Sequence, residues 1–474
     1  MRPSPWLASL LAGAAAFAAP QAQASVHRIQ GCQALGTSLD LVAVGGDRAA
    51  AQAALVAALD EIARLEPILS GWRQDSELSR LNRSASAQVS PDLYAVIEAA
   101  EAWRRPSGGA FDGRLGLVQA EGFGANAAAR AARLTLDPQT RTITRDPYAV
   151  LALDGIAKGY VIDAALKAAR RGAPTLEGLL IDIGGDLVVW GRGPGGDWRL
   201  GAADPARPED NASPGSTLRL TGGAMATSGR GARNTIHLTR EGLPASLASA
   251  TAVAACALDA DALSTALAAM QPAEGLALVE ATPGAEARLV GNDGGIYTSS
   301  GWRRLATDAP PAKLIRAAAV APASVGWPAG FQVSIEYQLL RPAKSPVYSP
   351  YLSIWITDAA GRMVRQLLLQ GNDLNYIDQN YVWWRRYGRS APRIVDAVTR
   401  PTRPAGRYSA VWDGKDQSGQ FVGQGKYTIH IEAIREHGAH SYQAIALDLA
   451  DQPVEGVGAA GEELGPSRVR YGRR

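Results

Sequence analysis

The sequence is poor in cysteine, with only Cys32 and Cys256 among its 474 residues. Two cysteines provide neither a disulfide framework nor a thiolate metal site. An excess of charge of one sign is also missing, because 48 basic and 45 acidic side chains leave a formal net charge of +3. This balance gives no indication of nucleic-acid binding. After residue 24 no apolar run reaches the roughly 20 residues that span a bilayer, so we expect no transmembrane segment in the mature chain.

The N-terminus has the pattern of an export signal. Arg2 precedes an apolar run from Trp6 to Ala19, which is followed by Pro20 and by the small-x-small pattern Ala22-Gln23-Ala24. The run is shorter than a membrane-spanning helix. We therefore interpret residues 1–24 as a secretory signal peptide and expect a periplasmic protein.

The length of the chain and a change in its residue pattern indicate several domains. A chain of 474 residues is too long for one ordinary core, so two or three domains are expected. Asp308-Ala309-Pro310-Pro311 interrupts periodic structure and predicts a linker. We therefore predict a first domain at 34–305, a linker at 306–330, a β-rich domain at 331–450 and a flexible basic tail at 451–474.

Helical and strand patterns alternate in the first domain. Asp47, and later Ser90 followed by Pro91, are typical of residues that begin helices, and apolar residues at helical spacing follow both. Further helices are predicted at 156–171 and from near Leu258, and strands at 34–44 and 179–183. These elements predict a domain of mixed α and β structure.

The pattern changes to alternation after the linker. Apolar and polar residues alternate at 331–337 and again from Leu352, as in half-buried antiparallel strands. A turn-rich stretch that begins with Trp412-Asp413-Gly414 is typical of a long hairpin, and we predict an immunoglobulin-like sandwich. The run Trp383-Trp384-Arg385-Arg386 fits either the core of this sandwich or a recognition surface.

Two oxygen-bearing side chains lie one turn apart in the helix that begins near Leu258. Asp261 and Thr265 share a helix face, and both carry hard oxygen ligands of the kind that magnesium prefers. Magnesium needs few protein ligands, because water and substrate phosphate complete its coordination. The other interpretation is that Asp259 and Asp261 only favour the helix N-terminus electrostatically while Thr265 packs.

Two further segments are suited to phosphate. Gly155-Ile156-Ala157-Lys158 places a glycine and a cation at a helix N-terminus, where a phosphate is stabilised. Thr227-Ser228-Gly229 forms a loop that can donate hydrogen bonds to a phosphate or to the edge of a flavin ring. Taken singly, Lys158 could be a solvated lysine and the loop an ordinary turn.

The order of these segments resembles the ApbE-type FAD:protein FMN transferase family, over roughly Leu35 to Trp302. The matching segments are Leu35-Gly36-Thr37, Leu69-Ser70-Gly71-Trp72, Asp75 to Asn82, Gly109-Ala110-Phe111-Asp112, Gly155 to Tyr160, Ile183-Gly184-Gly185-Asp186, Ala226-Thr227-Ser228-Gly229 and Asp261 to Thr265. The last third of the chain resembles the periplasmic domain family known as DUF2271. This implies an α+β, T-fold-like transferase domain followed by an all-β domain.

The resemblance implies a reaction and a set of site residues. In that family the FMN half of FAD is transferred to a Ser or Thr of an acceptor protein, with magnesium bridging the phosphates. Gly155, Asp261 and Thr265 are then implied as magnesium ligands, and His237 and Asp261 as catalytic residues. The residues implied to bind FAD are Leu35, Trp72, Ala110, Phe111, Asp112, Lys158, Thr227, Ser228, Gly229 and Ile236.

The chain departs from the family pattern at two positions. Thr235 stands where the family has a histidine, and His237 would point to the same strand face and could replace it. Ala152 stands where the family usually has an aspartate. These departures keep open a relative that binds or hydrolyses FAD without transfer. A third possibility is an interaction protein whose C-terminal sandwich recruits redox partners.

The acceptor is expected to be a separate protein. The family's acceptor motif is Asp-x-x-Ser/Thr-Gly-Ala-Ser/Thr, and this chain contains no Ser/Thr-Gly-Ala. The expected partners are therefore FAD, magnesium and a periplasmic or membrane acceptor.

Overall fold

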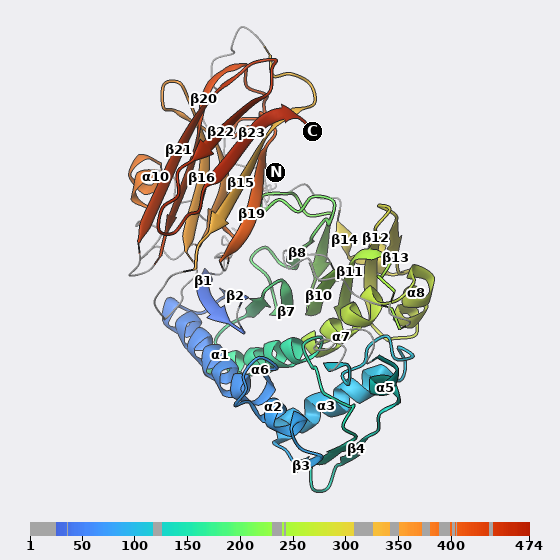
Figure 1. Cartoon of the computed structure of the whole chain (residues 1–474). Coiled ribbons are helices and arrows are strands. Elements are labelled where there is room, and N and C mark those ends of the chain that lie inside the picture. Colours follow the sequence, from blue (N-terminus) through green and yellow to red (C-terminus); the bar gives the residue numbers. More distant parts are fainter. Residues whose placement is uncertain are drawn as a thin grey trace, which may run out of the picture.

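The computed structural model describes residues 25–35, 37–116, 126–229, 239–240, 243–307, 326–341, 350–371, 380–387, 399–400, 403, 405–435 and 439–474. The predicted signal peptide and most of the predicted linker lie outside this part of the chain. Figure 1 shows a mixed first domain and, beside it, a domain built of strands.

The first domain is built around an antiparallel sheet of eight strands in the order β1-β2-β6-β7-β10-β11-β12-β13. Their bounds are β1 Val26–Ala34, β2 Thr37–Val44, β6 Gly178–Ile183, β7 Asp186–Gly191, β10 Gly223–Gly229, β11 Leu247–Ala254, β12 Glu286–Gly291 and β13 Ile296–Thr298. The predicted strand at 179–183 is confirmed as β6. The strand predicted at 34–44 is corrected, because Leu35 has a φ of 52° and turns the chain between β1 and β2.

Alternating side chains of this sheet belong to two cores. In β2, Leu39 and Leu41 pack with the helices, whereas Val42 and Val44 pack on the other face. That second face is covered by a three-stranded sheet of β14 (Ala306–Thr307), β9 (Ser216–Leu220) and β8 (Trp198–Ala202). A third sheet contains β3 (Ser86–Gln88), β5 (Thr142–Arg145) and β4 (Leu134–Asp137).

The predicted helix starts are confirmed. The Asp47 carboxylate accepts the N–H of Ala50 at 2.8 Å, and the Ser90 hydroxyl accepts that of Leu93 at 3.3 Å. In the described part of the first domain the helices are α1 Arg48–Leu69, α2 Glu77–Asn82, α3 Pro91–Arg104, α5 Asn126–Ala131, α6 Ala157–Gly172, α7 Ala257–Ala268, α8 Pro272–Glu280 and α9 Trp302–Leu305. Side chains of α1, α6 and α7 fill the larger core against the sheet.

Helices α6 and α7 cap each other at their N-terminal turns. Asp163 of α6 accepts the N–H groups of Ala257 and Leu258, at 2.9 and 3.0 Å. Asp261 of α7 accepts the N–H of Gly159 at 2.9 Å. Neither helix has a hydrogen bond from its own N-cap side chain, so each depends on the other to satisfy its first backbone donors.

Gly159 makes this approach of the two helices possible. A Cβ atom added at Gly159 would lie 2.2 Å from the carbonyl oxygen of Ala257. Since no side chain fits there, the backbones of α6 and α7 are in direct contact at their N-terminal turns. This contact brings the two predicted site helices together.

The second domain consists of two sheets that enclose one apolar core. The first has the order β19-β15-β23-β22, and the second has the order β18-β17-β16-β20-β21. Their bounds are β15 Phe331–Leu339, β16 Tyr351–Asp358, β17 Met363–Gln370, β18 Thr399–Arg400, β19 Gly406–Trp412, β20 Gly425–Ile434, β21 His440–Leu449, β22 Val454–Gly458 and β23 Ser467–Arg473. The immunoglobulin-like type of this sandwich stays a prediction.

The run of tryptophans and arginines forms the short helix α10 (Tyr381–Arg386) on the outer face of the second sheet. Trp383 is 1% exposed and belongs to a buried apolar cluster that includes Trp355. Glu432 of β20, which is fully buried, accepts the N–H groups of Val382 and Trp383 at 2.9 Å each. Trp383 is therefore a core residue of this domain and is not part of a recognition surface.

The flexible basic tail predicted at 451–474 is wrong. Residues 454–458 and 467–473 form β22 and β23, and β23 lies between β15 and β22 in the sheet. Val469 and Tyr471 point into the core, while Arg468 and Arg470 on the opposite face pair with Glu455. The arginines of this segment alternate with buried residues, as a half-buried strand requires.

The first domain docks on the sandwich through the loop between β8 and β9. Asp210 of this loop is 5% exposed and accepts hydrogen bonds from the Tyr337 hydroxyl at 2.6 Å and from Arg403 at 2.7 Å. Its own N–H donates to the carbonyl of Ser409 at 2.8 Å.

Asn211 continues this contact along the edge strand β19. Its side-chain amide donates to the carbonyl of Val411 at 2.6 Å, and its amide oxygen accepts the N–H of Val411 at 2.9 Å. An exposed edge strand is a site of unwanted pairing. The loop from the first domain forms hydrogen bonds with backbone groups on part of this edge.

We expect Asp210→Ala to lower the free energy of unfolding of the sandwich by about 1–3 kcal/mol, because it removes the acceptor of the buried Tyr337 hydroxyl. Denaturant unfolding of the full chain measures this change. Glu209→Gln, one residue earlier in the same loop, is the matched control. Equal stability of wild type and Asp210→Ala would contradict a docking role for this carboxylate.

Candidate active site

The predicted site residues of α6, α7 and β10 lie together on the helical side of the large sheet. Asp261 and Thr265 come from α7, and Ser228 comes from β10. The loop predicted at Thr227-Ser228-Gly229 is therefore wrong, because these residues end strand β10 and pair with β11. The Thr265 hydroxyl donates to the carbonyl oxygen of Gly155 at 3.4 Å, just before the first turn of α6. The structure thus brings together all three residues that the sequence predicts as metal ligands.

Hydroxyl groups extend this cluster toward β10. The Ser228 and Ser264 hydroxyls lie 2.9 Å apart, and the Ser264 hydroxyl donates to the carbonyl of Asp261 at 3.0 Å. Ser228 also lies 3.5 Å from the Thr265 hydroxyl. Ser264 is not among the site residues predicted from the sequence. Its position between Asp261 and Thr265 on the same helix could have indicated it.

The Asp261 carboxylate is buried, with 4% of the residue exposed. Burial, with the neighbouring charge of Asp186, raises the pKa of Asp261 to about 7, while Lys158 acts in the opposite direction. A bound cation would favour the ionised form of such a carboxylate.

The donor set fits magnesium. Asp261 offers a carboxylate, Thr265 a hydroxyl and Gly155 a backbone carbonyl, all of them hard oxygen donors. Among the described residues, no three or more His, Cys, Asp or Glu side chains gather into a metal cluster. A site with one carboxylate and two neutral oxygens is therefore suited to an ion that keeps water or phosphate in its remaining positions.

Lys158 forms an ion pair with Asp186, the first residue of β7. The other oxygen of Asp186 accepts the N–H of Thr227 at 3.0 Å. The hairpin before Asp186 turns on Gly184 and Gly185, whose φ angles are 64° and 97°. Asp186 lies in a segment that matches the family, but its pairing with Lys158 is not predictable from the sequence.

The other residues predicted to bind FAD differ in how far their side chains are exposed to solvent. Trp72 is 86% exposed, so its indole is free to stack on a ligand. Ala110 and Phe111 are buried in the core, and Leu35 packs against it. Asp112 has a side chain only 1% exposed and forms an ion pair with Arg114 at 2.7 Å. The side chain of Asp112 is thus held inside the fold, and only its backbone is left for contact with FAD.

His237, Ile236 and Thr235 lie outside the described residues. The segment resumes at Thr239 and Arg240, and Arg240 donates to the carbonyl of Gly108 at 3.3 Å and pairs with Glu274. The role of His237 therefore stays a prediction.

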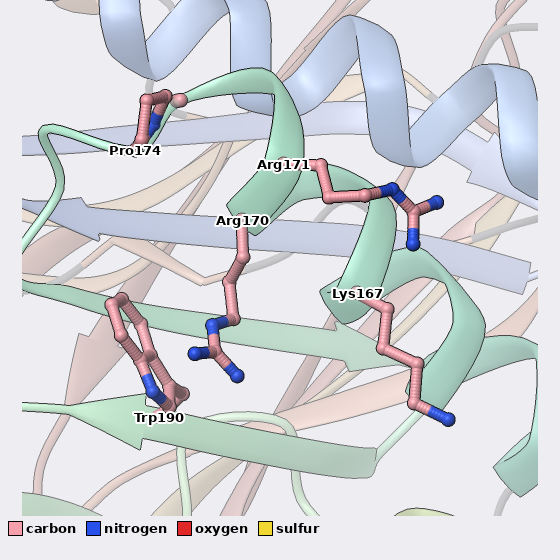
Figure 2. A pocket seen from close by; sticks show the side chains of 6 residues that line it. Lys167, Arg170, Arg171, Pro174 and Trp190 are labelled. Atoms are coloured by element: carbon pink, nitrogen blue, oxygen red, sulfur yellow. The ribbon is translucent and has the colours of Figure 1, made fainter.

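A shallow depression of about 400 Å³ lies at the C-terminal end of α6, opposite the end that carries Lys158. It is lined by Lys167, Arg170, Arg171, Ala173, Pro174 and Trp190. Figure 2 shows the Arg170 guanidinium beside the Trp190 ring, 4.2 Å from its centroid. The depression contains none of the predicted site residues.

Comparison with known families matches both domains. The ApbE family model matches residues 35–289, and the model described as a predicted periplasmic protein (DUF2271) matches residues 332–465. The FAD:protein FMN transferase of Klebsiella pneumoniae is 26% identical over 302 residues, which is 56% of this chain and 84% of the relative. That of Treponema pallidum is 28% identical over 296 residues, 52% of this chain and 80% of the relative.

Solved structures show the same fold. The ApbE protein of Thermotoga maritima has a TM-score of 0.51 at 23% identity, covering 60% of this chain and 100% of its own. The flavin transferase ApbE of Vibrio cholerae has a TM-score of 0.50 at 23% identity, covering 60% of this chain and 99% of its own.

The family model and the relatives named FAD:protein FMN transferase identify a transferase of the flavin-transferring class. The chain belongs to the ApbE family and carries a DUF2271 domain after its transferase domain.

We expect Gly155→Ala to separate the Gly155 carbonyl from Thr265, because the new Cβ would lie 2.8 Å from the Thr265 hydroxyl oxygen. The free energy of unfolding should fall by about 1–3 kcal/mol, and stabilisation by added magnesium with FAD should be lost. Thermal unfolding with and without these ligands measures both effects. Gly195→Ala, where a Cβ has no neighbour within 4 Å, is the control; equal ligand stabilisation in the two variants would contradict the site.

Proposed function

We propose that the first domain transfers the FMN moiety of FAD to a Ser or Thr hydroxyl of a separate acceptor protein, in a magnesium-dependent reaction. The observation that carries the proposal is the cluster of Asp261, Thr265 and the Gly155 carbonyl, with Lys158 in the first turn of α6, three residues after Gly155. The relatives named FAD:protein FMN transferase support it.

The reaction exchanges the phosphoanhydride bond of FAD for a phosphoester bond to the acceptor. The acceptor hydroxyl oxygen attacks the phosphorus on the FMN side of the pyrophosphate, the bond to the AMP phosphate breaks, and AMP leaves. The hydroxyl proton passes to a base, the role predicted for His237. When bound, magnesium neutralises charge that builds on the phosphate oxygens.

The residues of this chain bind and orient the reactants. Gly155, Asp261 and Thr265 would hold the ion through their oxygens, and the Lys158 ammonium would lie beside the pyrophosphate. The exposed ring of Trp72 offers a stacking face to the flavin. Positioning and charge stabilisation supply most of the catalysis in transfers of this type.

The compartment proposed for the reaction is the periplasm. The DUF2271 family is described as a predicted periplasmic protein, and the N-terminal sequence has the pattern of an export signal. Within the described part of the chain, none of the helices has the length and apolar character needed to cross a membrane. The acceptor is a second protein, because the chain lacks Ser/Thr-Gly-Ala.

The direct test mixes the purified mature chain with FAD, magnesium and a peptide bearing the acceptor motif, and measures the peptide mass. We expect the wild type to add one FMN and Asp261→Ala to reduce the rate at least about 100-fold, because the only carboxylate of the proposed metal site is lost.

Asp259→Asn is the matched control on the same helix, since an amide oxygen can still accept the Trp103 indole N–H that Asp259 accepts at 2.9 Å. Undiminished transfer by Asp261→Ala would refute the proposed metal site. Release of free FMN and AMP without a labelled peptide would instead favour the hydrolytic relative that Thr235 and Ala152 leave open.

A further inference from the structure

Asp186 connects two elements that face the proposed phosphate site, although the reaction outlined above assigns it no step. It is the first residue of β7 and is 4% exposed. One carboxylate oxygen pairs with the Lys158 ammonium of α6, and the other accepts the N–H of Thr227 of β10 at 3.0 Å. A single buried carboxylate therefore contacts both a helix and a strand of the site.

The hydrogen bond between Thr227 and Asp186 lies where the pairing of β7 with β10 ends. The pairing of β7 with β10 ends at Leu187 and Met225. Beyond this pair the side chain of Asp186 supplies the acceptor for the Thr227 N–H. The next residue, Ser228, lies 2.9 Å from Ser264 and 3.5 Å from Thr265. The chain of contacts thus runs from Lys158 through Asp186 and β10 to the α7 residues beside Asp261.

The negative charge of Asp186 favours a role in positioning Lys158 over a role in binding the phosphate. A negative group beside a phosphate site repels the phosphate, so its presence does not increase the affinity of the site for FAD. It does restrict a lysine whose long side chain has many rotamers of its own. Fixed placement of a cation contributes to the rate of phosphoryl-type transfer more than to binding.

We propose that Asp186 is a positioning residue for FMN transfer, which holds the Lys158 ammonium and the backbone of β10 at a fixed separation. This inference rests on the proposed function. If it is correct, loss of the Asp186 charge lowers kcat but leaves the affinity for FAD unchanged or higher.

Asp186→Asn is the variant that tests this, because its amide oxygen can still accept the Thr227 N–H while the charge opposite Lys158 is lost. We expect kcat for FMN transfer to fall about 10–100-fold, with the Kd for FAD, measured by quenching of flavin fluorescence, unchanged or lower. Asp197→Asn, which removes one charge of a partly exposed ion pair with Arg219, is the matched control and should leave both values unchanged.

A double-mutant cycle tests whether Asp186 acts through Lys158. If it does, Asp186→Asn should add less than about a twofold loss to the Lys158→Met variant, because interacting residues are not additive. Multiplied losses in the double variant would overturn the inference. So would a parallel rise in Kd and fall in kcat, which a general loss of structure produces.

A measurement that does not depend on FMN transfer tests this inference independently of the proposed function. An amine-reactive reagent, followed by peptide mass spectrometry, should label Lys158 several times faster in Asp186→Asn than in the wild type without FAD. Equal labelling rates would show that Asp186 does not hold the lysine. A wild type that transfers no FMN would refute the proposed function, while the labelling result would still decide whether Asp186 holds Lys158.

Discussion

The reciprocal capping of α6 and α7 is the interaction on which the site depends. Asp163 accepts the first N–H groups of α7, Asp261 accepts the N–H of Gly159, and Gly159 has no side chain to keep the helices apart. Because Asp261 caps α6 from α7, a residue that secures the fold also lies one helical turn from Thr265. Gly155 and Thr265 meet only because the two N-terminal turns are in contact.

Much of the first domain follows from local sequence. Asp47, Ser90 and the glycine pair at 184–185 have strong helix-cap and turn preferences, and they lie where these preferences predict. The pairing of Asp261 with Thr265 follows from helical spacing. The roles of Asp163 and Asp186 do not, because each acts on an element distant in sequence.

The predictions that the structure contradicts also have physical explanations. Residues 451–474 read as a tail because arginines are frequent there, yet a strand with one solvated face accepts an arginine at every second position. Leu35 adopts a positive φ that non-glycine residues seldom take, so the hairpin between β1 and β2 had no sequence signal. Asp112 matched a family segment, but its burial with Arg114 is set by tertiary packing.

The sandwich is joined to the transferase domain by polar contacts along an edge strand. Asp210 is buried against Tyr337 and Arg403, and Asn211 pairs with the backbone of Val411. Such contacts favour one defined placement of the domains, since a displaced Asp210 would leave the Tyr337 hydroxyl without its acceptor. The DUF2271 domain is thus docked on the transferase domain through specific hydrogen bonds.

We propose that Gly155, Asp261 and Thr265 together hold a divalent ion against the FAD pyrophosphate. Crystals of the full chain soaked with FAD and Mn²⁺, in place of Mg²⁺, test it through the anomalous signal of manganese. We expect one anomalous peak within coordination distance of these three oxygens and of a phosphate oxygen. Ordered FAD with the peak elsewhere, or with no peak at this cluster, would contradict it.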